Sequence, residues 1–132
     1  MTEEEKQLLL VDLSARLPYG VCVHIRYKEG EPCYGKLTPR DIQWFIDSKI
    51  EVIKLYLRPL SSMTEEEEKE YEGFIIHRKH VNAQGQEWDI DCFSFNTAPR
   101  LIDWLNAHHF DYHGLIEKGL AIAVDENNNP YN

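Results

Sequence analysis

The stretch GVCVHIRY, residues 20–27, decides the fold class of this chain of 132 residues. Apolar and polar side chains alternate along it, so an extended backbone sorts them onto two faces: Val21, Val23, Ile25 and Tyr27 on one, and Cys22, His24 and Arg26 on the other. This alternation predicts a strand with one face on a core and one toward water. Residues 28–32 contain the Gly and Pro typical of a turn, and residues 33–37 predict the returning strand of a hairpin.

Helix signals stand on both sides of this predicted hairpin. Thr2 and Glu5 have the spacing of a capping box, in which each side chain accepts a hydrogen bond from the other residue's backbone N–H. Leucines then recur at helical spacing as far as Leu17, which predicts an amphipathic helix. Residues 38–49 fit two structures, because Thr38 favours a helix start whereas apolar residues at every second position fit a strand. We favour the helix.

The rest of the chain alternates between strands and helices. The patterns predict a strand over residues 51–58, an acidic helix from Thr64, a strand over residues 88–95, a helix over residues 97–107 and a last strand over residues 120–124. Together these elements predict an α+β fold, with a small antiparallel sheet of about four short strands and three to four helices packed on one side. The length predicts one globular domain over residues 1–125, followed by a polar, frayed tail over residues 126–132.

The net charge of -9 is distributed unevenly along the chain. Residues 1–62 hold nine acidic and nine basic side chains, whereas residues 63–132 hold fourteen acidic and five basic ones. Binding to DNA or RNA requires clustered Lys and Arg that release counterions from phosphate. We therefore expect no direct nucleic-acid binding and favour another protein as the partner.

The string MTEEEEKEYE, which starts at residue 63, contains more carboxylates than a helix start requires. Thr64 and Glu67 have capping-box spacing, and acidic residues in a first turn complement the helix dipole. The excess lies further on, and it forms a candidate protein-binding surface made of Glu68, Glu70 and Glu72. The alternative interpretation is an ordinary solvated helix face.

A polar and aromatic cluster follows the last predicted helix and contains His108, His109, Asp111, Tyr112 and His113. A histidine beside a carboxylate is the arrangement that general acid–base catalysis requires. Histidines after a helix also cap its last carbonyl groups, which is the structural alternative. The cluster is therefore a candidate site whose side chains should converge on one pocket if it is functional.

His77 and His80 offer a second, weaker possibility. Three residues apart, they could share a helix face and, with Asp89 and Asp91 of the following strand, bind a metal ion. The three cysteines lack the paired spacing of a zinc ribbon or disulfide scaffold, which favours free thiols. No glycine-rich phosphate loop is present in the sequence, so we expect no cofactor.

Neither an apolar membrane span nor a basic and then apolar leader occurs in the sequence, so we expect a cytoplasmic protein with no membrane association. Three phrases add a resemblance: ARLPYGV from Ala15, YLRPLSSMTEEE from Tyr56 and DWLNAHHFDYHGLIEKGLA from Asp103. In them the chain resembles a family of small proteins from gut Bacteroidales, their phages and their mobile elements. The resemblance covers most of the chain except residues 27–55, and it implies an accessory protein without assigning any catalytic or binding residue.

Three functional hypotheses follow from these observations. The first is a non-enzymatic acidic protein that binds another protein, in its sharpest form an inhibitor of a host or competing-element function. The second is a metal-dependent or histidine-based enzyme that uses the cluster at residues 108–113 or the His77 and His80 pair. The third is a structural or self-assembling module, whose oligomeric state the sequence does not define.

Overall fold

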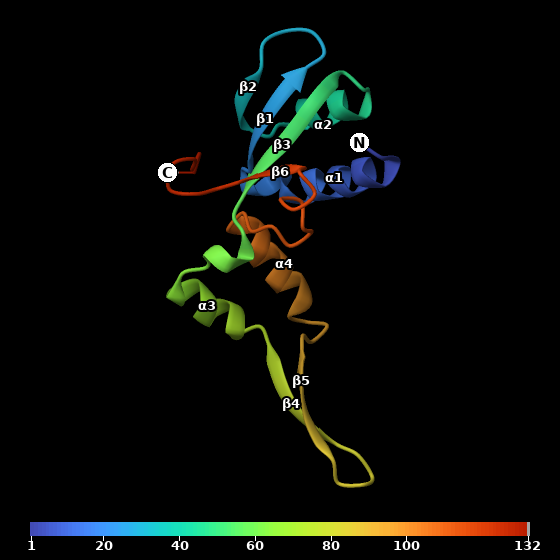
Figure 1. Cartoon of the computed structure of the whole chain (residues 1–132), viewed down its shortest axis with the longest axis vertical. Coiled ribbons are helices and arrows are strands. Elements are labelled where there is room, and N and C mark those ends of the chain that lie inside the picture. Colours follow the sequence, from blue (N-terminus) through green and yellow to red (C-terminus); the bar gives the residue numbers. More distant parts are fainter. Residues whose placement is uncertain (132) are drawn as a thin grey trace. The chain divides into compact units, whose positions relative to one another are not determined.

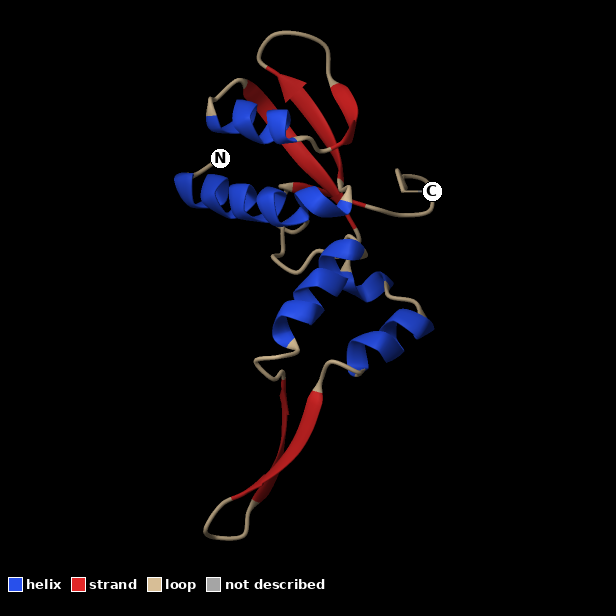
Figure 2. Ribbon diagram, turned by 180° about the vertical axis from the view of Figure 1, so that it is seen from behind, coloured by secondary structure: helices blue, strands red, loops and turns tan. Residues whose placement is uncertain are grey.

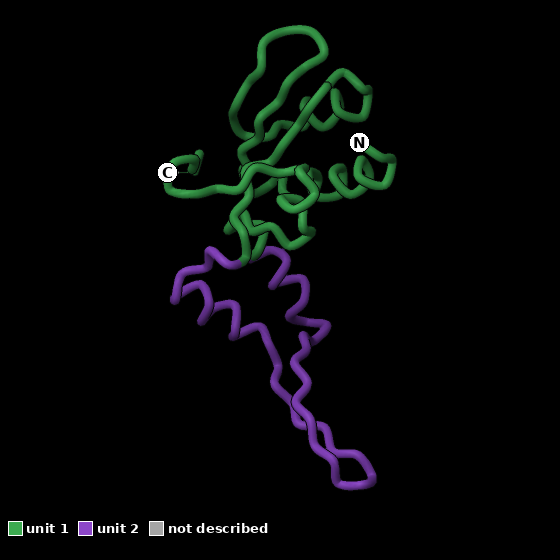
Figure 3. Tube along the Cα trace, viewed as in Figure 1, with its two compact units in different colours: residues 1–60, 105–132 green, residues 61–104 purple. Residues whose placement is uncertain are grey.

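The computed structural model describes residues 1–131 and divides the chain into two compact units. Unit 1 contains Met1–Leu60 and Leu105–Asn132, and unit 2 contains Ser61–Trp104 (Figure 3). The sequence predicts one domain over residues 1–125, whereas the chain leaves unit 1 after Leu60 and returns at Leu105. No helix within residues 1–131 is long and apolar enough to cross a membrane.

Unit 1 is built on a four-stranded sheet in the order β2-β1-β3-β6 (Figure 1). Its strands are β1 (Cys22–Tyr27), β2 (Cys33–Lys36), β3 (Ile50–Leu57) and β6 (Ala121–Ala123). β1 pairs antiparallel with both β2 and β3, whereas β6 runs parallel to β3. The α+β class is confirmed, and the sheet is mixed because a long excursion through unit 2 lets the chain re-enter beside β3 in the same direction.

Helices cover one face of this sheet. α1 (Glu3–Arg16) and α2 (Pro39–Ile46) both begin with the predicted capping boxes, which confirms the helix over the ambiguous residues after Thr38. Leu9 and Leu13 of α1 join the buried core formed by Val23, Ile25, Ile53 and Leu55 of the strands. α2 packs against the same core with Ile42, Trp44 and Phe45. Figure 2 shows both helices in front of the strands, and Figure 1 shows the strands from the other side.

Unit 2 consists of two helical segments and a hairpin. α3 (Glu65–Glu72) begins with the third capping box, between Thr64 and Glu67. β4 (Ile76–Val81) and β5 (Glu87–Cys92) form an antiparallel two-stranded sheet, and α4 (Ala98–Ala107) follows. The helical interpretation of His77 and His80 is wrong, because both lie in β4.

The C-terminal segment is anchored where the sequence predicts a frayed tail. The Tyr131 hydroxyl accepts a hydrogen bond from the Cys22 backbone N–H at 2.9 Å and donates one to the Tyr56 carbonyl at 2.6 Å. These bonds hold residue 131 on the ends of β1 and β3. The polar composition of the tail therefore does not reveal that Tyr131 is fixed to the sheet. Asn132, the last residue of the predicted tail, lies outside the described residues.

Candidate functional site

A buried ion pair lies at the centre of the polar cluster in unit 1. Asp12 and Arg16, one helical turn apart on α1, are both fully buried, and the Arg16 Nε donates to Asp12 Oδ1 at 2.5 Å. The Arg16 Nη2 also donates to the Phe110 carbonyl at 2.7 Å. A buried guanidinium is tolerated only when such partners replace water. Arg16 therefore joins α1 to the segment after α4.

Two residues of the predicted 108–113 cluster contact this ion pair. The His113 Nδ1 lies 2.7 Å from Asp12 Oδ2, and the Arg16 guanidinium carbon lies 4.9 Å from the centre of the Tyr112 ring. The Tyr112 hydroxyl is directed elsewhere and donates to Asn106 Oδ1 at 2.8 Å. His113 thus contacts the carboxylate of the buried ion pair, and the Tyr112 ring contacts its guanidinium.

His109 has a different environment within the same cluster. Its ring stacks on Tyr131 with centroids 3.8 Å apart and planes 8° apart, and its Nδ1 is buried without a hydrogen-bond partner among the described residues. Burial lowers the pKa of His109 to about 4, with smaller contributions from the charges of Arg16, His108 and Arg58. The ring is therefore neutral at neutral pH and packs as an aromatic side chain.

Asp111 serves a backbone role in this cluster. Its Oδ1 and Oδ2 accept hydrogen bonds from the Leu115 and Ile116 N–H groups, both at 3.0 Å, so it caps the following turn. His108 stacks on Phe110 with ring centroids 6.2 Å apart. The five predicted side chains therefore lie near one another but point to separate partners, and the arrangement is typical of a structural network.

The three glutamates of α3 that were predicted to bind a partner differ in their contacts within unit 2. Glu70 Oε2 accepts a hydrogen bond from the Trp104 indole at 2.7 Å, and Glu72 Oε2 lies 3.1 Å from His77 Nε2. Trp104 in turn packs against Tyr71 and Phe74, and the three half-buried rings form an aromatic cluster in unit 2. All three side chains are exposed, but Glu70 and Glu72 have partners within unit 2, whereas no hydrogen bond or ion pair of the Glu68 side chain is found within residues 1–131.

The His77 and His80 pair does not form a shared site. Residues three apart in a strand project to opposite faces. His77 bridges Glu72 and Asp91, whereas the His80 ring packs 4.5 Å from the Trp88 ring on the other face. Hydrogen bonds that the imidazole donates to the Asp91 and Glu72 carboxylates raise the pKa of His77. Within residues 1–131 no group of three or more His, Cys, Asp or Glu side chains has the arrangement of a metal site.

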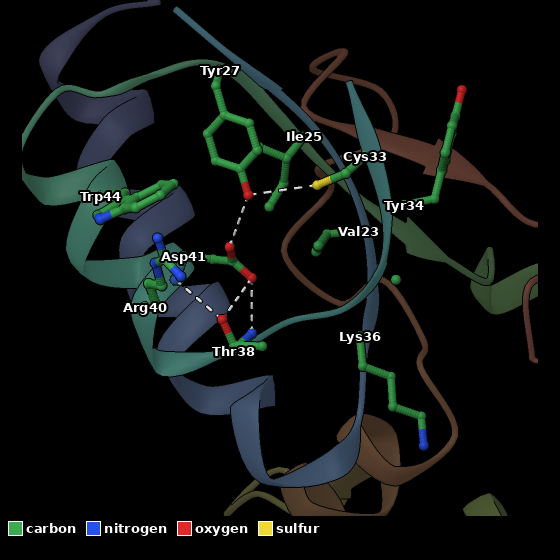
Figure 4. A pocket seen from close by; sticks show the side chains of 11 residues that line it. Val23, Ile25, Tyr27, Cys33, Tyr34, Lys36, Thr38, Arg40, Asp41 and Trp44 are labelled. Atoms are coloured by element: carbon green, nitrogen blue, oxygen red, sulfur yellow. Dashed lines mark hydrogen bonds between the residues drawn. The ribbon is translucent and has the colours of Figure 1, made fainter. Parts of the chain in front are cut away.

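A cavity of about 420 Å³ lies between β1, β2 and α2 (Figure 4). Val23 and Ile25 line its apolar part, and a chain of hydrogen bonds crosses it. The Cys33 thiol donates to the Tyr27 hydroxyl at 3.5 Å, which donates to Asp41 Oδ1 at 3.2 Å. The hydrogen bond from Cys33, burial and the Asp41 charge all raise the pKa of Tyr27. Tyr27 therefore stays protonated and is no base for the thiol.

The Asp41 carboxylate in this cavity also accepts hydrogen bonds from Thr38. Its Oδ2 accepts from the Thr38 N–H at 3.0 Å and from the Thr38 hydroxyl at 2.9 Å, which is the capping of α2. The Arg40 guanidinium lies 4.1 Å from the Trp44 ring centre at the cavity wall. The cavity has the size of a small-molecule site, but its Tyr27, Thr38 and Asp41 side chains already form hydrogen bonds with one another or with Cys33.

The hairpin of unit 2 carries an exposed surface that the sequence patterns did not identify. The strand register places Ile76, Arg78 and His80 opposite Cys92, Ile90 and Trp88, and these six residues share one face, here called the Trp88 face. Trp88 is 44% exposed and Ile90 is 38% exposed. The sequence shows the alternation in β5, but whether an element covers that face depends on tertiary structure.

The opposite face of the hairpin is charged and internally paired. His77 Nδ1 lies 2.7 Å from Asp91 Oδ1, and Lys79 Nζ lies 3.9 Å from Glu87 Oε2. One face of the hairpin is therefore ion-paired, whereas the Trp88 face combines the exposed side chains of Trp88 and Ile90 with Arg78 and His80. Functional inference rests on this geometry, because no family model matches the chain and neither curated proteins nor solved structures give a match.

Proposed function

We propose that this protein is a non-enzymatic protein-binding protein that contacts its partner through the Trp88 face of the β4–β5 hairpin. The observation that carries the proposal is the exposure of Trp88 and Ile90 on a hairpin whose other face is already paired with itself. Exposed apolar groups gathered on one surface mark interaction sites in folded proteins.

The stability of isolated hairpins supports this proposal. A two-stranded sheet is marginally stable in water, and a hydrophobic face or a packing partner is normally needed to hold it. Within unit 2 the strands extend beyond α3 and the unit 2 part of α4 (Figure 3). A partner that covers the Trp88 face supplies the missing apolar contacts, and the ion-paired face remains in water.

Further apolar surface continues from the end of β5. Phe93 is 44% exposed and Phe95 is 98% exposed. Aromatic residues are enriched at the energetic centres of protein interfaces and rarely stay fully exposed without a contact. We infer that the contact extends from Trp88 along β5 and, past the end of that strand, to Phe95.

Charge adds a preference for a basic partner. Residues 61–104 contain ten acidic and four basic side chains, so most of the net charge belongs to unit 2. An acidic surround raises the association rate with a positively charged protein. Of the predicted docking carboxylates, Glu68 keeps this role, since Glu70 and Glu72 have partners within unit 2.

The family resemblance gives this proposal its biological setting. An accessory protein of a phage or mobile element that binds another protein would act on a host or competing-element protein in the cytoplasm, and inhibition is the simplest effect of such binding. Catalysis is no part of this proposal, because the histidine clusters serve structural contacts in unit 1 and in the hairpin.

The test compares capture by three forms of the protein. Wild type, a Trp88→Ala/Ile90→Ala double variant and a Val81→Ala control are used to capture partners from a host-cell extract, with quantification by mass spectrometry. Val81 is the matched control because it is 55% exposed on the ion-paired face of the same hairpin. Affinities for the captured protein are then measured with purified components.

We expect the double variant to lose on the order of 2 kcal/mol of binding energy, a roughly thirty-fold weaker affinity, because tryptophan side chains dominate interface energetics. The Val81→Ala control should bind like wild type. If wild type and the double variant enrich the same proteins to the same extent, the Trp88 face is not the contact surface and the proposal is wrong.

A further inference from the structure

Within residues 1–131 no helix covers the outer face of the unit 1 sheet, and residues 127–130 of the C-terminal segment line a hollow with Cys22, Tyr34 and Tyr56 at one end of it. Val23 and Ile25 point into the core, so the intervening residues of β1 point away from it. Strand pairing extends this surface across β2, β3 and β6. We call the following residues the outer sheet face: His24, Arg26, Tyr34, Lys36, Val52, Lys54 and Ile122. Figure 1 shows these strands with no helix in front of them within residues 1–131.

The outer sheet face is basic although the chain is acidic. It carries Arg26, Lys36 and Lys54 together with His24, and none of its seven positions holds a carboxylate. In the described part of the chain, no side-chain ion pair involves these three cations. Clustered like charges without counterions repel one another, so an anionic occupant is favourable here.

The same face offers contacts beyond charge. Tyr34 is 69% exposed, and its ring meets the His24 ring edge-on at 4.5 Å. A hollow of about 380 Å³ is lined by His24, Arg26, Lys54 and the apolar side chains of Val52 and Ile122. An occupant with carboxylates on a rigid element can thus pair with the cations and also cover apolar surface.

We propose that the outer sheet face binds the acidic helix α3 of a second copy of this chain. Six of the eight residues of α3 are glutamates, and the complementary charge is therefore present in the same sequence. Glu67 caps the helix, while Glu70 and Glu72 have partners in unit 2. Glu65, Glu66 and Glu68 are exposed and remain available for a second copy.

The dimensions of the two surfaces agree. Neighbouring strands are about 4.8 Å apart and alternate residues about 6.7 Å apart. Because Lys36 lies opposite Cys22 and Lys54 opposite His24, the backbone positions of these two lysines are about 12 Å apart. A helix with its side chains is about 10–12 Å across. A helix of this width can therefore lie across β1 with one lysine on either side of it, over His24.

This contact joins unlike surfaces. Reciprocal exchange of α3 between two copies closes a dimer, whereas one-way exchange builds a longer chain. Neither arrangement uses the Trp88 face. The inference shares Glu68 with the proposed function but not the Trp88 face, so a Trp88→Ala/Ile90→Ala variant should associate with itself like wild type.

The experiment measures molar mass by light scattering over about a hundred-fold range of concentration. It is done at about 0.1 M salt, where charges are screened over about 10 Å, and at about 1 M salt, where they are screened over about 3 Å. We expect concentration-dependent association at low salt that disappears at high salt. A strictly monomeric chain under the low-salt condition overturns the proposal.

Charge reversal identifies the surfaces that meet. An Arg26→Glu/Lys54→Glu variant should associate at least about ten-fold more weakly, because two ion pairs become repulsive contacts. Lys6→Glu/Lys118→Glu is the matched control, since it changes the net charge equally at exposed positions outside the outer sheet face. Equal weakening in both variants attributes the effect to net charge and overturns the proposal.

A swap of both charges provides the decisive comparison. Glu65→Lys/Glu68→Lys should also abolish self-association, yet a mixture of this variant with Arg26→Glu/Lys54→Glu should associate again. Circular dichroism checks that α3 remains folded, and Glu65→Gln/Glu68→Gln replaces the reversal if it does not. Failure of the mixture to associate, or binding of a short oligothymidine in place of a second copy, overturns the proposal.

Discussion

Replacing His109 by Phe should remove a loss of stability that the wild-type chain suffers between about pH 6.5 and about pH 4. Burial lowers the pKa of the folded imidazole to about 4, whereas the unfolded side chain titrates near 6.5. As the pH falls through this window, the unfolded chain binds a proton that the folded chain rejects. The contribution of this group to stability is therefore fully present above pH 6.5 and is lost by about pH 4.

The loss of stability can be calculated from the difference between the pKa of His109 in the unfolded and folded chain. Each pKa unit corresponds to about 1.36 kcal/mol, so the full shift is worth up to about 3 kcal/mol. The ring is only partly buried, and about 2 kcal/mol is the expected value after allowance for solvent screening. Total stabilities are about 5–15 kcal/mol, so this is a measurable fraction.

Phenylalanine is the appropriate replacement because it keeps the stacking on Tyr131 and removes the buried Nδ1 that has no partner among the described residues. Position 109 has a φ of 62°, and any cost of an aromatic side chain there is the same at every pH. The difference between the two proteins, measured at two pH values, therefore isolates the titration of His109.

The assay is urea unfolding of both proteins at about pH 7.5 and about pH 4.5, with free energies from linear extrapolation. We expect the Phe variant to gain about 2 kcal/mol relative to wild type as the pH is lowered. His80→Phe, on the exposed hairpin, controls for the general effect of removing a histidine. A gain below about 0.5 kcal/mol for His109→Phe would show that the ring is not held neutral by burial.

Three further predictions concern the contacts that join distant segments. Asp12→Ala should destabilise unit 1 by about 3–5 kcal/mol because it leaves the Arg16 guanidinium buried without its carboxylate, as urea unfolding will measure. Tyr131→Phe should cost about 1–3 kcal/mol through loss of its two hydrogen bonds to backbone, which thermal unfolding followed by circular dichroism will test. Glu70→Ala should change tryptophan fluorescence through loss of its indole partner, whereas Glu68→Ala should not.

The helix starts could be predicted because their causes are local. Thr2, Thr38 and Thr64 each act on a backbone N–H three residues away, so the capping box is complete within four residues of sequence. The fold class followed, because amphipathic helices and alternating strands limit the ways in which apolar faces can be covered. The direction of β6 could not be predicted, since it depends on where the chain returns after unit 2.

Burial of Arg16 illustrates what a local pattern cannot reveal. Helical spacing places Arg16 on the face of Leu9 and Leu13, but it does not show that the Phe110 carbonyl, 94 residues away in sequence, accepts a hydrogen bond from the buried guanidinium. The β4 strand was missed for a related reason. Neither of its faces enters a core, so its sequence, IHRKHV, has no alternation of apolar and polar residues that would indicate a strand.

The distribution of charge over the surface also depends on tertiary structure that the sequence does not reveal. The acidic surface of α3 can be predicted from the sequence because its glutamates are neighbours along the chain. The cations of the outer sheet face are not neighbours: Arg26 and Lys54 come together only because β1 pairs with β3, and Lys36 joins them because β2 pairs with β1. A net charge of -9 thus describes the whole chain and not each of its surfaces. Strand register can gather a minority of cations on one face, and this is why an acidic protein can bind an anionic helix.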